Sequence, residues 1–383
     1  MTLTRFMTKN AFRNKRRSLL TVLSISFSLL LLTLMMTIWR SFYIDQGAPE
    51  SAERLITRHR VSLTIFLPRF YRDKIRALPG VVGVVPMTWF GGRYKDDKPE
   101  NFFAQFATDP SEYLKIYTDK AVPPEQMEGW QRDRAGAMVD VELAKKHGWK
   151  VGDRIVLKGT IFEVNPELTI RAMYTAPRPN NALYFHMTYL EEAVPWYKGQ
   201  TGFFSTRVAS PEAVAQVSRE VDEMFRNSPQ PTKTESEKAF QLGFVAMLGN
   251  VKAFILSICM AVVFAILLVS GNTMAMSIRE RVREVALLET LGFTRGTILG
   301  LFVGEAVMLS LLGGLLGVLF ASGVVQLLTR SPMGVGLTQG MHVTIPTQVV
   351  ALMIAALVGF VSAFVPAYHA SRVNIVEGLR HVG

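Results

Sequence analysis

Long apolar stretches dominate the hydrophobic pattern of this chain. Residues 18–38, 253–277 and 343–368 contain no Asp, Glu, Lys or Arg, and residues 297–329 contain one acid, Glu305. A helix of about 20 apolar residues crosses a bilayer. Any one stretch could be a buried core helix, but four of them in a chain that is 49% hydrophobic indicate an integral membrane protein. We predict spans at residues 18–39, 253–277, 297–329 and 343–368.

The excess of basic residues lies next to these spans. The net charge is +11, yet residues 40–250 contain 28 Lys and Arg against 26 Asp and Glu, and the rest of the chain contains 14 against 5. By the positive-inside rule, both termini and residues 278–296 face the cytoplasm, as expected for a multi-pass protein of the cell (inner) membrane. Membrane lipid accounts for the surplus, so no nucleic-acid partner is expected.

The segment between the first two spans, residues 40–236, is then extracytoplasmic, and it alternates helix and strand signals. Helices are expected at 70–78, at 141–147 with Gly148 after its end, and from a Ser210 cap to about 225. Strand candidates lie at 137–139, 154–158, 168–174 and 203–208. The predicted fold is an α-helical membrane protein with four transmembrane helices and a large α+β extracytoplasmic domain inserted between helices 1 and 2.

Short segments complete the predicted organisation. They are a cytoplasmic amphipathic basic segment at 1–17, a linker at 227–236, a stalk helix at 237–252 continuous with the second span, a cytoplasmic helical segment at 278–296, a short outer loop at 330–342 and a cytoplasmic tail at 369–383.

Motifs for catalysis or cofactor binding do not occur in the sequence. It has no G-x-x-x-x-G-K-[ST] phosphate loop, no H-E-x-x-H, no paired-cysteine metal spacing and no G-x-S-x-G elbow. The single cysteine, Cys259, lies within the second span, which leaves no intrachain disulfide. We therefore expect no catalytic, cofactor-binding or metal-binding residues, and no enzyme.

A charged amphipathic helix is predicted between the second and third spans, ending near Gly292. Arg279 and Arg283 lie four residues apart, as do Glu280 and Glu284. The pair Glu280 and Arg283 stabilises such a helix by about 0.2–0.5 kcal/mol. Spacing alone leaves a solvated loop with arginines on the inner side as the alternative.

Several blocks of sequence resemble the FtsX-like/MacB-like ABC transporter permeases. The segment SIRERVREVALLETLGFTRGTI, after N-x-M and before E-A, resembles the family's connection between its second and third spans. PAYHASR at 366–372 with VEGLR at 376–380 resembles its closing motif, and residues 10–20 resemble its entry into the first span. Within the insert, LPGVVGVVP and GWKVGDRI are similar phrases.

The resemblance implies a mechanotransmission subunit of the type VII class. Cytoplasmic ABC ATPase subunits, expected here as separate polypeptides, would bind ATP and magnesium, so that no cofactor belongs to this chain. A second permease subunit, identical or related, would complete the complex. In the family the coupling helix at this position inserts into a groove of the ATPase. The residues expected to form that surface are Arg279, Glu280, Arg281, Arg283, Glu284, Glu289 and Thr290.

Small residues and one acid stand out within the third span. Gly300 with Gly304, and Gly313 with Gly317, form two G-x-x-x-G steps that let helices approach closely, either within the chain or in a dimer. An ionised Glu305 is costly inside a membrane unless it is paired. We expect a structural pair with an arginine of the coupling helix rather than a proton-coupling role.

Two functions stay open at this point. One is export or extraction of a lipid-linked, peptide or hydrophobic cargo by the permease. The other is a non-transporting relay that activates an extracytoplasmic partner, such as a cell-wall hydrolase or a sensor. A membrane-anchored enzyme is a third class, but it lacks a catalytic constellation.

Overall fold

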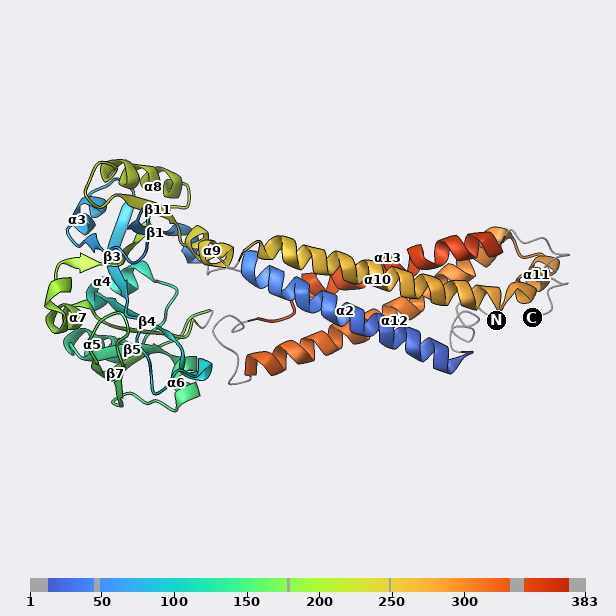
Figure 1. The fold of residues 1–383 in the computed structure, drawn as a ribbon, viewed down its shortest axis with the longest axis horizontal. Coiled ribbons are helices and arrows are strands. Elements are labelled where there is room, and N and C mark those ends of the chain that lie inside the picture. The colour runs from blue at the N-terminus through green and yellow to red at the C-terminus, as the bar shows by residue number, and fades with distance from the viewer. Residues whose placement is uncertain (1–12, 45–48, 178–179, 248, 331–340, 372–383) are drawn as a thin grey trace. The chain divides into compact units, whose positions relative to one another are not determined.

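The computed structural model describes residues 13–44, 49–177, 180–247, 249–330 and 341–371. The chain divides into two compact units (Figure 1). One comprises Met1–Ile44, Asn250–Leu327 and Met341–Gly383, and the other comprises Asp45–Gly249 and Leu328–Gly340. Most of the predicted basic segment, outer loop and cytoplasmic tail lies outside the described residues.

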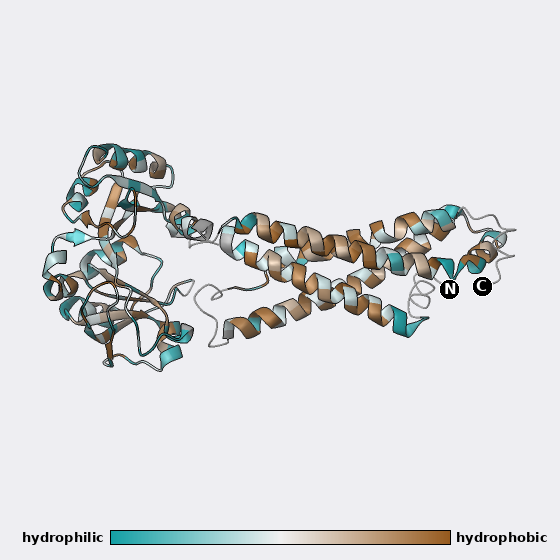
Figure 2. Ribbon diagram, viewed as in Figure 1, coloured by the Kyte–Doolittle hydropathy of each residue, from teal (hydrophilic) through white to brown (hydrophobic). Residues whose placement is uncertain are grey.

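The first unit is built from long apolar helices. These are α2 (Lys15–Tyr43), α10 (Val251–Arg279), α12 (Arg295–Arg330) and α13 (Ile345–Ala370), with the short α11 (Val282–Thr290) between α10 and α12. In the described part of the chain, four helices are long and apolar enough to cross a membrane. Hydrophobic residues cover them along most of their length (Figure 2). The prediction of four transmembrane helices is confirmed at this level.

Close contacts hold these helices together. A Cβ atom at Gly317 would lie 2.6 Å from the backbone oxygen of Ser26, so α12 and α2 touch where the glycine lies. The hydroxyls of Ser270 and Ser362 are 2.9 Å apart and join α10 to α13. Small residues and paired hydroxyls therefore set the packing, as expected where lipid removes the hydrophobic drive between helices.

The second unit is an α+β domain around a mixed sheet of nine strands, in the order β11-β1-β10-β3-β4-β8-β5-β7-β6. These strands are β1 (Arg54–His59), β3 (Val81–Trp89), β4 (Ala104–Thr108), β5 (Gly136–Asp140), β6 (Arg154–Val156), β7 (Glu167–Tyr174), β8 (Ala182–His186), β10 (Phe203–Val208) and β11 (Thr232–Ser236). The pairs β4–β8 and β5–β7 are parallel and the others antiparallel. A small sheet pairs β2 (Leu67–Pro68) with β9 (Gln200–Thr201).

Helices and short 3₁₀ turns cover this sheet. They are α3 (Tyr71–Arg76), α4 (Pro110–Ile116), α5 (Pro124–Arg132), α6 (Val141–His147), α7 (Met187–Ala193), α8 (Ala213–Met224), α9 (Glu237–Met247), η1 (Pro49–Glu53), η2 (Pro99–Asn101) and η3 (Pro195–Tyr197). The predicted α+β fold is confirmed, and α6 has the bounds expected from its sequence, with Gly148 left-handed at its end. The helix expected from Ser210 begins instead at Ala213, after Glu212.

The predicted linker was wrong in its second half. Residues 232–236 form β11, which pairs with β1, and the hydroxyls of Thr234 and Thr57 meet at 3.0 Å in the interior. Asp222 of α8 accepts hydrogen bonds from the Thr232 hydroxyl and the Thr234 backbone. The polar, proline-containing sequence predicts a linker. It forms a strand instead, because its side chains find these partners once the domain folds.

The predicted continuous stalk was also wrong. The helix α9 ends at Met247 and α10 begins at Val251, with Gly249 between them at φ +90°. The Asn250 side chain accepts a hydrogen bond from Ala253 N at 3.1 Å and caps α10. A glycine in the left-handed region followed by a capping asparagine ends one helix and starts another.

Candidate functional site

The candidate site is the segment that joins α10 to α12. Residues 280 and 281 separate α10 from α11, and Gly292 at φ +88° ends α11, so the predicted helix is present but shorter and bent away from α10. Val285 and Ala286 are buried. Val285 packs into an apolar cluster with Ile278 of α10, Ile298 and Phe302 of α12, and Ala367 and Ala370 of α13. One face of α11 is thus fixed to three membrane helices.

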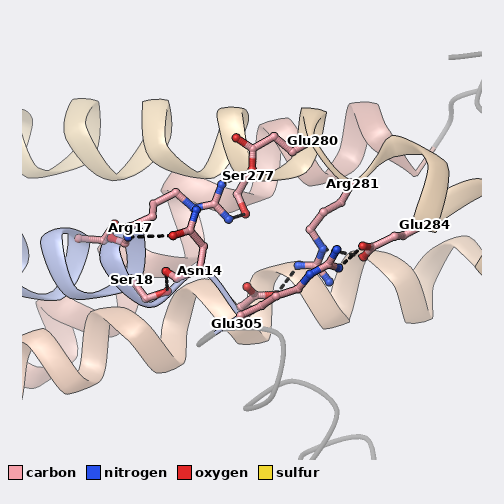
Figure 3. A network of polar contacts seen from close by, with 10 residues as sticks. Asn14, Arg17, Ser18, Ser277, Glu280, Arg281, Glu284 and Glu305 are labelled. Atoms are coloured by element: carbon pink, nitrogen blue, oxygen red, sulfur yellow. Dashed lines mark hydrogen bonds and ion pairs between the residues drawn. The ribbon is translucent and has the colours of Figure 1, made fainter. Parts of the chain in front are cut away.

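Arg281 is the centre of the polar contacts behind this face (Figure 3). Its Nη1 lies 2.8 Å from Glu305 Oε2 and its Nε lies 3.0 Å from Glu284 Oε2. The guanidinium also lies over the Phe302 ring, 4.9 Å from the centroid. The side chains of Arg281 and Glu305 are 12% and 9% exposed. The arginine partner expected for Glu305 is therefore present.

These contacts alter the electrostatics of Arg281 and Glu284. Burial lowers the pKa of Arg281, but Glu305 and then Glu284 favour the charged form, so the net shift is upward. Burial raises the pKa of Glu284, but hydrogen bonds from Arg13 and Arg281 outweigh it and the net shift is downward. Both groups are therefore held in their ionised forms.

The beginning of α2 contributes two further arginines. Arg17 Nη1 lies 2.5 Å from Glu280 Oε2, and its Nη2 donates to Ser277 Oγ at 2.9 Å (Figure 3). Arg13 forms an ion pair with Glu284. These contacts tie the start of the first span to the end of the second span and to α11. Topology and the family resemblance were the only signals of these arginines in the sequence, because their partners are more than 250 residues away.

The predicted ATPase-contact residues fall into two groups. Arg279, Arg283 and Thr290 are exposed, and neither arginine forms an ion pair within the described ranges. Arg281 and Glu289 instead lie inside. One oxygen of Glu289 is buried without a hydrogen-bond partner, and its nearest described cation is Arg295 Nε at 3.9 Å. Little of the Arg281 and Glu289 side chains is thus exposed on the surface of the described chain.

Glu280 and Glu284 lie between these groups. Glu280 is exposed and Glu284 half-exposed, but the arginines described above already occupy both carboxylates.

Exposed apolar side chains accompany the exposed arginines of this segment. Leu287 is 55% exposed and Leu291, four residues later, is 68% exposed, although leucine is normally buried. Phe293 follows Gly292, beyond the end of the helix, and is 40% exposed. The spacing of the two leucines was a signal for one helix face. Arg279 ends α10, Arg283, Leu287 and Thr290 belong to α11, and Leu291 and Phe293 follow it. We call these exposed residues together the outer face of α11.

The two G-x-x-x-G steps of α12 differ in their contacts. A Cβ at Gly313 would lie 2.8 Å from Ile25 Cγ2, and Gly317 contacts the α2 backbone, so this step packs within the chain. Nothing lies within 4 Å of a Cβ at Gly300, so the close approach expected there is not found in the described chain. Gly304 is half-buried.

No group of three or more His, Cys, Asp or Glu that could hold a metal ion occurs among the residues that the structure describes.

Two family models match the sequence. The MacB-like periplasmic core domain matches residues 18–224, and the FtsX-like permease C-terminal domain matches residues 253–375. The second match includes α10, α11, α12 and α13, and with them the whole candidate site.

Known proteins resemble the chain to different extents. It is 24% identical to the ABC transporter permease MJ1507 of Methanocaldococcus jannaschii, over 98% of this chain and 96% of that one. It is 30% identical to the ABC transporter permease YknZ of Bacillus subtilis, over 46% and 44%. It is 38% identical to the pyoverdine export ATP-binding/permease protein PvdT of Pseudomonas savastanoi, over 30% of this chain and 17% of that protein.

Two solved structures of outer domains are also similar. The extracellular domain of YknZ has a TM-score of 0.35 at 11% identity and covers 48% of this chain and 99% of that domain. The periplasmic region of MacB from Actinobacillus actinomycetemcomitans has a TM-score of 0.37 at 8% identity, with coverage of 50% and 92%.

Proposed function

The chain belongs to the FtsX-like ABC transporter permeases with a MacB-like periplasmic core domain, and from this we propose its function. It would transmit ATP-driven motion from separate cytoplasmic ATPase subunits to the α+β domain within Asp45–Gly249, which we call the outer domain. The motion would serve export or extraction of a lipid-linked, peptide or hydrophobic cargo. The observation that carries the proposal is α11. Its inner face is fixed to membrane helices, while its outer face presents arginines and leucines without partners of their own in the described chain.

This proposal places α11 and both termini on the cytoplasmic side of the inner membrane. The basic surplus supports that side. The ion pairs of Arg13 and Arg17 with Glu284 and Glu280 support a common side for the start of α2 and α11. ATP and magnesium would be bound by the ATPase subunits, and a second permease subunit, identical or related, would complete the complex.

The contacts around α11 explain how a movement of α11, caused by an ATPase subunit, could be transmitted to the membrane helices. Arg281 connects the start of α11 to Glu305 of α12, and Arg17 connects the end of α10 to α2. Because breaking the buried Arg281–Glu305 pair is costly, a partner that moves α11 would move this part of α12 with it, while the more exposed Arg17–Glu280 pair links α2 more weakly.

At the other end, α9 is fixed to the outer domain. Arg54 Nε lies 2.5 Å from Glu237 Oε2 at the start of α9, and Arg54 Nη1 lies 2.7 Å from Asp119 Oδ1. Burial lowers the pKa of Arg54, but Glu237 outweighs it and the net shift is upward. Motion of α10 would reach α9 through the break at Gly249, so the two helices need not move as one rod.

Charge reversal at Arg283 tests the proposal. The proposal takes the ATPase surface that faces Arg283 to be acidic, so Arg283→Glu would set like charges against each other and could cost several kcal/mol of association. Substitutions at exposed helix positions change the stability of the permease itself by about 0.5 kcal/mol or less. We expect the tagged permease to lose its ATPase subunit while expression and folding stay normal. Arg219→Glu, at an exposed arginine on α8 of the outer domain, is the matched control.

Equal ATPase retention by the two variants would overturn the assignment of this face. Glu284 should not be reversed together with Arg283, because it pairs with Arg13 and Arg281 and its loss would disturb the inner contacts. ATP hydrolysis by the reconstituted complex, measured with and without candidate cargo, then separates export from the relay alternative, in which only an activated partner protein would respond.

A further inference from the structure

An apolar cavity of about 450 Å³ lies within the outer domain. Five aromatic side chains line it: Phe66, Trp89, Phe106, Phe203 and Phe240. The remaining lining residues are two aliphatic residues, a glycine and a threonine, so no charged side chain faces the cavity. Phe240 belongs to α9, and the others come from β3, β4, β10 and the loops beside them. The cavity therefore lies between the sheet and the helix that leads to the second span.

The aromatic walls are ordered against each other. Trp89 meets Phe106 edge to face at a centroid distance of 5.2 Å, and Phe106 meets Phe203 at 6.1 Å in the same way. Phe203 and Phe240 are tilted at 6.2 Å. Each ring thus has a preferred packing partner. The walls are held by these contacts without a ligand, as is usual for a largely preformed site.

The size and chemistry of the cavity restrict its occupant. Its volume is about three times that of the roughly 150 Å³ apolar cavity that takes one benzene, so a chain of about 16–18 carbons would fill it. A charged or strongly polar ligand would lose its water without gaining partners. Among the described lining residues, Thr64 supplies the one hydroxyl and Trp89 an indole N–H, and the Thr64 hydroxyl lies 2.8 Å from that of Ser62.

The mouth of the cavity is apolar and open to the outside. Ile161 lines it and is 51% exposed, and Trp89 is 37% exposed. Phe102 is exposed next to Trp89, with the ring centroids 6.4 Å apart. Exposed large apolar side chains gathered at a pocket mark a binding surface. An amphiphile could insert its chain here and leave its polar head in water with the hydroxyls of Thr64 and Ser62.

We propose that this cavity binds one acyl chain of an amphiphile. The binding of an acyl chain is independent of the proposed function. Only the statement that this acyl chain belongs to the transported cargo rests on the proposed function. Occupancy would place the chain against Phe240 of α9, three residues after Glu237 with its bond to Arg54. A bound acyl chain would therefore contact α9, the helix through which the proposed motion would reach the outer domain.

Photolabelling of the full chain tests the proposal. The chain is placed in nanodiscs of defined phospholipid, a photoactivatable palmitate probe is titrated, and adducts are located by mass spectrometry. We expect saturable adducts on residues that line the cavity. Competition with a phospholipid in one arm and with a palmitoylated peptide in another identifies which amphiphile supplies the chain.

Ile161→Asp is the decisive variant, because it puts a carboxylate at the apolar mouth. We expect labelling to fall about tenfold or more, since an unpartnered polar group disfavours an apolar ligand. Val151→Asp is the matched control, at an exposed apolar residue in another loop of the same domain, and it should label like the natural chain. Ile161→Trp, which narrows the mouth without adding charge, should also lower labelling.

Equal labelling of the Ile161 and Val151 variants, or adducts scattered over the outer domain, would overturn the proposal. Thermal melting of each variant shows whether the domain is folded. The labelling experiment needs no ATPase subunit, and we expect the Arg283→Glu variant to be labelled like the natural chain. A loss of labelling would therefore concern the cavity, and a loss of ATPase retention would concern the proposed function.

Discussion

The buried pair of Arg281 and Glu305 allows a quantitative test of what holds the start of α11 against α12. Glu305→Gln keeps the size of the side chain and one acceptor oxygen but removes its charge. Arg281 then retains only Glu284, whose side chain is 37% exposed, and the face of Phe302. The variant therefore leaves a largely buried guanidinium with a weaker, more solvated partner.

The expected cost follows from the burial of the two carboxylates. Removing one partner of a buried ion pair costs about 3–5 kcal/mol, and we expect about 2 kcal/mol here because Glu284 and Phe302 remain. Glu284→Gln removes a carboxylate from the same arginine at a more exposed position, where a pair contributes about 0–1 kcal/mol. Glu284→Gln also loses the exposed ion pair with Arg13, which can only lower its stability further, so a larger loss for Glu305→Gln must come from the burial of the lost charge.

The free energy of unfolding of the first unit is the quantity to measure. Cys259 is the only cysteine of the chain and lies half-buried in α10, so its reaction with a maleimide during SDS titration reports on this unit alone. We expect the unfolding midpoint of Glu305→Gln to fall clearly below that of Glu284→Gln. The double variant Arg281→Met with Glu305→Leu should recover much of the loss, because an apolar pair leaves no buried charge.

Equal midpoints for the two single variants would refute this reasoning. The pair would then be a solvated contact, and the rigidity that we assign to the inner side of α11 would have to come from its apolar cluster.

Three further variants test other parts of the structure. Burial, with help from neighbouring lysines, holds the pKa of His147 at about 4, below its ordinary 6.5, so the unfolded state binds more protons between these values. The outer domain should therefore lose stability as pH falls from 6.5 to 4, and His147→Gln should flatten that dependence in thermal melts. Lys120 is buried among four tyrosine rings and donates to two phenol oxygens, at 2.6 and 2.8 Å. Lys120→Ala should cost about 2–4 kcal/mol in denaturant titrations, against about 0.5 kcal/mol or less for Lys115→Ala. Gly317→Ala should lower the SDS midpoint, because its Cβ meets the α2 backbone, while Gly300→Ala, in open space, should leave it unchanged or raise it through helix propensity.

Much of the architecture was predictable because its signals are local. A stretch without charge long enough to cross a bilayer is read from composition alone, and helix ends such as Gly148 and Gly292 are set by residues that favour the left-handed region. The coupling segment was found in the same way, from charge spacing and from its likeness to known permeases. These features depend on residues within a turn or two of each other.

The roles of individual site residues depended on tertiary structure. Arg281 and Arg283 are two positions apart with the same chemistry, yet one is buried against Glu305 and the other is exposed. No spacing rule separates them, because the difference lies in which side of α11 packs on α12. The partners of Arg17 and the aromatic walls of the outer cavity likewise come from distant parts of the sequence.

The sequence by itself therefore determined which segments cross the membrane, which segment is the large insert and which short helix carries the charge. Only the tertiary structure decided which of those charges form ion pairs inside the molecule and which stay exposed. The physical reason is that hydrophobic length and helix termination act locally along the chain, whereas the pairing of a buried charge and the shape of a cavity are set by residues brought together only on folding.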